Sequence, residues 1–182
     1  EEAMARYSIS NLHAGTQQNL SSSYETLVSL TAATGATTLR KAWIYDIMVG
    51  ADGTPADNAL TYKVDRQTTV GTGTAATASP LDAGDAAALI TETVNNTSEP
   101  TVTSATQMFE LAVNQRASYR WVAAPGGELV VPATNAAGDR IAGQVRCLYK
   151  HRYGNAPLLG VVLEYQIVTP MARGASDGQH LG

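Results

Sequence analysis

The sequence predicts an all-β protein, and three observations carry this prediction. Apolar residues recur at every second position through most of the chain, which is the period of a strand with one buried face. Short alternating runs are separated by Gly-, Pro- and Asn-containing turns at intervals of about 8–15 residues, a spacing typical of β-sandwiches and barrels. Thr and Val are frequent, and both favour pleated, half-buried surfaces. We therefore expect about eight to ten strands in a sandwich or barrel, with at most one short helix.

Size and charge narrow the possible partners. The chain has 182 residues, which fits one domain with a core large enough to fold without disulfides or metals. Only 15% of its residues are charged, against about 25% in a typical soluble domain. The net charge of -4 argues against a nucleic-acid partner, because such proteins normally carry a basic face. No apolar run approaches the ~20 residues that cross a bilayer, so we expect no membrane partner.

The first clear strand covers residues 39–50, where two sets of apolar residues alternate. One set is Trp43, Tyr45, Ile47 and Val49, and the other is Ala42, Ile44 and Met48. Because both sets are apolar, we expect both faces of this strand to be covered. Residues 50–58 contain an Asp-Gly pair and then a Pro, which predicts a turn.

The next strand, residues 60–70, has one apolar and one polar face. Leu60, Tyr62 and Val64 alternate with Thr61, Lys63 and Asp65. We expect the polar set to face water. Residues 71–74 break this strand, and residues 82–89 are the only segment of helical composition. Residues 88–94 form another strand, and the Asn- and Pro-containing residues 95–100 form its turn.

The second half of the chain adds five strands, and polar segments flank the whole body. The strands are residues 101–113, 117–122, 128–131, 141–149 and 160–168. We expect Trp121 to pack in the core. The predicted organisation is an N-terminal arm over residues 1–23, a sandwich domain over residues 24–169, and a C-terminal tail over residues 170–182.

Residue types that carry catalysis or bind metals are sparse. His13, His151 and His180 have no metal-ligand spacing, and the lone Cys147 is expected to be a small buried apolar residue. The Gly-rich residues 71–74 lack the lysine and the helix start of a phosphate-binding loop. We therefore expect no catalytic residue, no metal and no cofactor.

Two stretches of the sequence resemble small structural proteins of tailed bacteriophages. They are GADGTPADNAL at residues 50–60 and RWVAAPGGELVVPAT at residues 120–134, and the resemblance extends over residues 5–146. Proteins of this kind include head decoration (cement) proteins with a jelly-roll-like β-sandwich. The resemblance therefore implies an all-β fold, a β-sandwich of jelly-roll type.

The resemblance also implies a function, a location and partners. A decoration protein, made in the host cytoplasm, binds the capsid exterior of the virion and reinforces the shell by bridging capsomers. The implied partners are the major capsid protein and copies of the chain itself, in a homotrimer at three-fold positions. Modest contacts suffice in such a lattice, because multivalency raises the overall affinity.

The residues that we expect at an interface are mainly cations, in the arms and near one strand. They are Arg6, Tyr7, His13, Arg116, Arg120 and Arg173. The low density of charge fits an assembly surface, because few charges must lose their water when it is buried against a neighbour.

Three other classes of function remain open at this point. Another virion component, such as a tail-tube, tail-end or head–tail connector protein, could use a sandwich with arms in the same way. A carbohydrate- or receptor-binding module needs exposed aromatic residues, and aromatic residues make up only 6% of the chain. An enzyme would need a pocket that gathers Asp, Glu or His.

Overall fold

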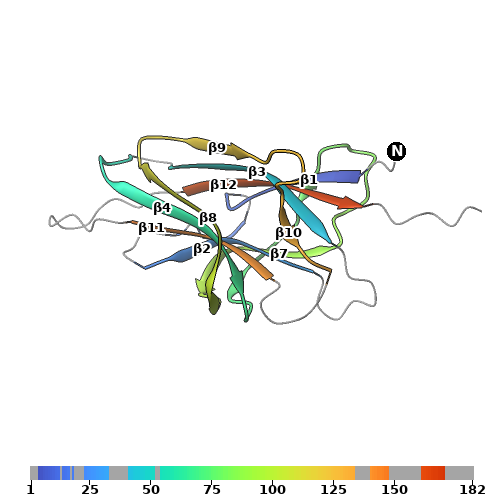
Figure 1. Cartoon of the computed structure of the whole chain (residues 1–182), viewed down its shortest axis with the longest axis horizontal. Coiled ribbons are helices and arrows are strands. Elements are labelled where there is room, and N and C mark those ends of the chain that lie inside the picture. Colours follow the sequence, from blue (N-terminus) through green and yellow to red (C-terminus); the bar gives the residue numbers. More distant parts are fainter. Residues whose placement is uncertain are drawn as a thin grey trace, which may run out of the picture.

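Every regular element in the described part of the chain is a β-strand (Figure 1). The computed structural model describes residues 4–12, 14–16, 18, 23–32, 41–51, 54–133, 140–147 and 161–170. The strands are β1 (Met4–Ser10), β2 (Glu25–Ala32), β3 (Ala42–Ala51), β4 (Ala59–Gln67), β5 (Thr72–Ala76), β6 (Ser79–Pro80), β7 (Ile90–Ser98), β8 (Val102–Asn114), β9 (Tyr119–Val122), β10 (Leu129–Val131), β11 (Arg140–Cys147) and β12 (Val161–Pro170).

These strands form two six-stranded sheets in which every pair is antiparallel. Sheet A has the order β10-β3-β12-β1-β6, with β9 also paired to β3. Sheet B has the order β5-β7-β2-β11-β4-β8. In Figure 1, β9, β3, β12 and β1 of sheet A lie above β11, β2 and β7 of sheet B. The all-β prediction is thus confirmed for the described residues.

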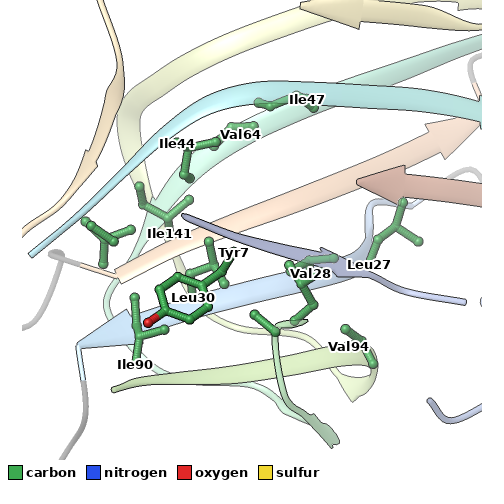
Figure 2. Packing of buried hydrophobic residues seen from close by; sticks show 14 of the residues in the cluster. Tyr7, Leu27, Val28, Leu30, Ile44, Ile47, Val64, Ile90, Val94 and Ile141 are labelled. Carbon is green, nitrogen blue, oxygen red and sulfur yellow. The ribbon is translucent and has the colours of Figure 1, made fainter. Parts of the chain in front are cut away.

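The core lies between the two sheets and takes side chains from both. Its largest fully buried members are Ile9, Leu27, Leu30, Ile44, Ile47, Leu60 and Ile141. Figure 2 shows such side chains, directed into one interior from β1 and β3 of sheet A and from β2, β4, β7 and β11 of sheet B. Trp121 packs against this core, as expected.

The segment of helical composition, residues 82–89, begins with a turn and forms no helix. Asp82 O accepts a hydrogen bond from Asp85 N at 3.0 Å, and the Asp82 carboxylate accepts one from Gly84 N at 2.8 Å. An Asp side chain that binds the backbone two residues further along favours a turn over a helix. Within the described residues, no helix has the length and apolar character needed to span a membrane.

The predicted N-terminal arm, residues 1–23, is wrong for residues 4–10. These residues form β1, which lies inside sheet A between β12 and β6. Ala5, Tyr7 and Ile9 are buried in the core, whereas Arg6 is exposed. Their alternation is the signal of a strand with one covered face. Of the predicted C-terminal tail, only Pro170 is described, as the end of β12.

The sequence also failed to reveal β2. All residues of this strand except Glu25 are buried, because β2 lies in the interior of sheet B between β7 and β11. Burial of both faces removes the alternation of apolar and polar residues on which a strand is normally recognised.

A β-bulge at Tyr45 reverses the alternation of β3. In the pairing with β12, Gln166 lies opposite Asp46 and Ile167 opposite Ile44, which leaves Tyr45 without a partner. Ile44 is therefore buried before the bulge, and Ile47 after it. The prediction placed Ile44 and Ile47 on opposite faces of this strand, and that assignment is wrong. The extra residue in the bulge turns the side chains that follow it to the other face, so both residues face the core.

The two faces of β4 are both covered, contrary to the predicted wet face. Leu60, Tyr62 and Val64 are buried, as expected, but Thr61 and Asp65 are each only 3% exposed. Asp65 forms an ion pair with Lys63, whose ammonium lies 4.0 Å from the ring centroid of Tyr24. Pairing of the charge is what makes burial of Asp65 tolerable.

The carboxylate of Glu92 is buried, as are those of Asp46 and Asp65. Glu92 of β7 is 4% exposed, and its Oε2 accepts a hydrogen bond from Ala78 N at 2.5 Å. Ala78 lies in the link between β5 of sheet B and β6 of sheet A. Burial raises the pKa of Glu92 to about 7, although the hydrogen bond from Ala78 opposes the shift. Glu92 therefore holds the link between the two sheets through this hydrogen bond. Its buried position disfavours the ionised form of its carboxyl group.

Candidate interaction surface

The structure separates the six residues expected at an interface. Arg6, Arg116 and Arg120 are exposed, and Tyr7 is buried in the core. His13 and Arg173 lie outside the described residues. Of the three exposed arginines, Arg6 and Arg120 lie on the same face of sheet A, as the pairing of its strands shows below.

Tyr7 is a core residue, so its assignment to an interface is wrong. It is 3% exposed, and its hydroxyl donates a hydrogen bond to Ala86 O at 2.8 Å. Figure 2 shows its ring among the buried side chains, near Ile90. The bond ties β1 to the segment before β7 and satisfies the polar end of the ring.

Removing this hydroxyl should weaken the fold without changing its shape. We expect Tyr7→Phe to lower the free energy of unfolding by about 1 kcal/mol, because the Ala86 carbonyl then loses its donor. Urea denaturation followed by circular dichroism measures the change. Tyr119→Phe is the matched control, since Tyr119 is 41% exposed, and equal losses in the two variants would contradict the role given to Tyr7.

Strand pairing places a set of side chains on the outer face of sheet A, the face turned away from the core. Asp46 pairs with Val122, and Met48 pairs with Arg120, whereas the intervening Ile47 is buried. Side chains on alternate residues of a strand point to opposite faces, so these four share the outer face. We use the name sheet A surface for Arg6, Tyr45, Asp46, Met48, Arg120 and Val122.

Arg120 and Asp46 form a forked ion pair within the sheet A surface. Arg120 Nε lies 3.0 Å from Asp46 Oδ1 and 3.1 Å from Oδ2, and Nη2 also binds Oδ2. The Asp46 side chain is 5% exposed and that of Arg120 is 59% exposed. Hydrogen bonding to Asp46 raises the pKa of Arg120. The pair fixes the guanidinium in one orientation, with its outer side open to a partner.

Tyr45 brings Arg6 into the same surface. The Tyr45 side chain lies in the bulge, near the charged groups of Arg6, Asp46 and Arg120. Burial raises the pKa of Tyr45, and the positive charge of Arg6 opposes this shift. Arg6 of β1 and Arg120 of β9 therefore lie on opposite sides of Tyr45. The bulge is what directs this ring toward both arginines.

Apolar side chains complete the sheet A surface. Val122 is 56% exposed and Met48 is 37% exposed. At the start of β3, Lys41 Nζ lies 5.0 Å from the ring centroid of Trp43. Arg, Met and aromatic side chains are the types enriched in protein–protein interfaces. The sheet A surface thus combines a fixed cation with accessible apolar side chains, as surfaces that contact other proteins do.

Arg116 lies apart from this surface, in the turn that follows β8. Asn114 O accepts a hydrogen bond from Ala117 N at 2.9 Å, and Asn114 Oδ1 accepts one from Arg116 N at 2.9 Å. The guanidinium of Arg116 is exposed and approaches Pro55 O at 3.5 Å. Arg116 therefore offers the same charge as Arg6 at a separate position.

Sequence reasoning missed Tyr45, Asp46, Met48 and Val122 as members of the surface. Their membership depends on the bulge and on the pairing of β3 with β9, which join residues distant in the chain. A local signal existed for Asp46 alone, as a carboxylate within an otherwise apolar strand. Such a residue is expected to have a cationic partner.

Known proteins give no indication of the function of this chain. No protein-family model matches the chain, and no match is found among curated proteins. Within the part of the chain that the structure describes, no group of three or more His, Cys, Asp or Glu side chains is placed to hold a metal ion.

Proposed function

We propose that the chain is a structural virion protein that binds the outer surface of a phage capsid and reinforces it by bridging capsomers. The sheet A surface carries this proposal. It presents two arginines, one of them locked by Asp46, beside exposed Met48 and Val122. Such a surface binds another protein by burying apolar area and by pairing fixed cations with carboxylates. The implied partners are the major capsid protein and, in a homotrimer, copies of the chain.

The order of the strands supports a jelly-roll β-sandwich as the finer description of the fold. The pairs are nested along the chain: β1 with β12, β2 with β11, β3 with β9, and β4 with β8. Nested pairing of eight strands across two sheets is what a rolled pair of Greek keys produces. Under this proposal β5, β6 and β7 are an insertion between β4 and β8, and β10 is an addition at β3.

Binding to capsids tests the proposal. We expect the purified chain to co-sediment with expanded capsids of its own phage and to raise the temperature at which they release DNA. The double variant Arg6→Glu with Val122→Asp should weaken binding by about 100-fold, since it reverses one charge and buries another on the proposed contact.

Arg116→Glu is the control for this experiment, because it reverses the charge of one arginine, as Arg6→Glu does, but outside the sheet A surface. It should bind like the original chain. Equal binding by the double variant and the control would contradict docking through the sheet A surface. Cryo-electron microscopy that places the chain on the tail or at the head–tail junction would replace decoration by another virion role.

A further inference from the structure

The exposed edges of the two sheets are unequal. In sheet A, the last strands are β6, β9 and β10, with only 2, 4 and 3 residues. In sheet B, one edge is β5, with 5 residues and a register shift between Thr72 and Thr74. The other edge is β8, which has 13 residues and pairs with β4 alone among the described strands. Three edges are thus short or irregular, and β8 is the exception.

The second half of β8 is a regular strand, and no described strand pairs with its side opposite β4. Residues 109–114 pair with residues 59–64 of β4 without a break in register. Just beyond, Gln115 N donates a hydrogen bond to Asn58 O at 2.9 Å. Because bonded and non-bonded pairs alternate in an antiparallel ladder, the backbone N–H and C=O of Glu110 and Ala112 point away from β4.

This edge lacks the features that normally prevent strand pairing. Native proteins protect edges with Pro, with Lys or Arg, with bulges, or by keeping the strand short. Residues 107–113 contain no Pro, Lys or Arg, and Glu110 is their single charge. Side chains on the inner face, Phe109, Leu111 and Val113, pack against the core, so the backbone is held extended and ready to pair.

We propose that a second copy of the chain pairs with this edge, β8 against β8 in antiparallel orientation, about a two-fold axis at Leu111. Glu110 then faces Ala112 of the second copy, and Phe109 faces its Val113. Glu110 and Ala112 of the two copies exchange four backbone hydrogen bonds. The two copies of sheet B become one continuous sheet, with Phe109, Leu111 and Val113 on its inner face. This contact is separate from the sheet A surface and does not depend on the proposed function.

The sequence of β8 favours this register over its neighbours. A two-fold axis at Glu110 would set two carboxylates directly opposite each other, which is unfavourable. An axis at Ala112 would need Asn114 O for pairing, but that oxygen already accepts a hydrogen bond from Ala117 N. An axis between two residues would place inner side chains opposite outer ones. The axis at Leu111 avoids all three conflicts, and it requires a partner with this same sequence.

The mass of the particle in solution tests the contact. We expect sedimentation velocity at about 100 μM to give an even number of copies, two or, where trimers also form, six. Ala112→Pro removes one bonding N–H but leaves the ladder with β4 intact, as Pro is tolerated on strand edges. Ala112→Pro should therefore halve the mass of the particle in solution. Ala112→Thr keeps the N–H and should leave the mass unchanged.

Two charged variants test the register and do not depend on the proline. Ala112 is exposed, so Lys or Glu at this position should leave the fold intact. Ala112→Lys faces Glu110 of the second copy and should tighten association by about 3-fold, while Ala112→Glu should weaken it by a similar factor. A mass of one or three copies for the original chain, or equal association of the Lys and Glu variants, would overturn the proposal.

Discussion

Replacing Ile9 by Ala is expected to lower the free energy of unfolding by about 3 kcal/mol. Ile9 is 0% exposed and lies in β1 between two paired strands. Truncation removes buried methyl groups and leaves a cavity that closely packed neighbours fill only in part. Equilibrium denaturation in urea, with circular dichroism as the signal, measures the loss as a shift of the midpoint at constant slope.

The exposed neighbour Arg6 supplies the control for Ile9→Ala. Arg6→Ala should change the free energy of unfolding by no more than about 0.5 kcal/mol, because the side chain lies on the outer face of the same strand. Similar small effects for both variants would mean that residues 4–10 form an arm and not part of sheet A. The comparison therefore decides between the sequence-based interpretation of this segment and its place in the structure.

Replacing Glu92 by Gln is expected to stabilise the protein at high pH. The pKa of Glu92 is about 7 in the folded chain, against an ordinary value of 4.5. Between these values the folded state binds more protons than the unfolded state, so this group lowers stability as pH rises from about 4.5 to 7. The advantage of Glu92→Gln over the original chain should grow by about 2–3 kcal/mol between pH 5 and pH 8.

Measuring both proteins across this range isolates the contribution of Glu92 from that of all other groups. Gln keeps an oxygen for the hydrogen bond from Ala78 N, so the link between the sheets is preserved. Glu128→Gln serves as control, because Glu128 lies at a turn near the surface and its carboxylate accepts a hydrogen bond from the exposed Gly126 N. An advantage of Glu92→Gln that does not change with pH would show that Glu92 ionises normally in the folded protein.

The strands that could be predicted are those in which apolar and polar residues alternate in the sequence, even where the polar face is covered as well. In β4, Leu60, Tyr62 and Val64 alternate with polar residues, and all three are buried. In β2 the same reasoning failed, because adjacent apolar residues such as Leu27 and Val28 interrupt the alternation in a strand that is buried on both faces. The signal in β1 was present in Ala5, Tyr7 and Ile9, but the polar residues that follow led to its assignment as an arm.

The sheet A surface could be predicted only in part. Arg6 and Arg120 were identified as exposed cations, and the structure places them on one face. Their proximity to Tyr45 depends on a bulge whose position is set by pairing with β12. Such pairing joins residues far apart in the chain, so the position of the extra residue cannot be read from the local sequence.

The place of β12 in sheet A has a consequence for synthesis. β12 lies between β3 and β1 and pairs with both, yet it follows every other described strand along the chain. Until residue 170 has emerged, β1 and β3 each keep one unpaired side, and the interior of sheet A is open to solvent. We therefore expect a stalled nascent chain that ends before residue 161 to be cleaved rapidly by protease, whereas the released chain resists cleavage. Closure of sheet A therefore has to wait for the synthesis of residues 161–170.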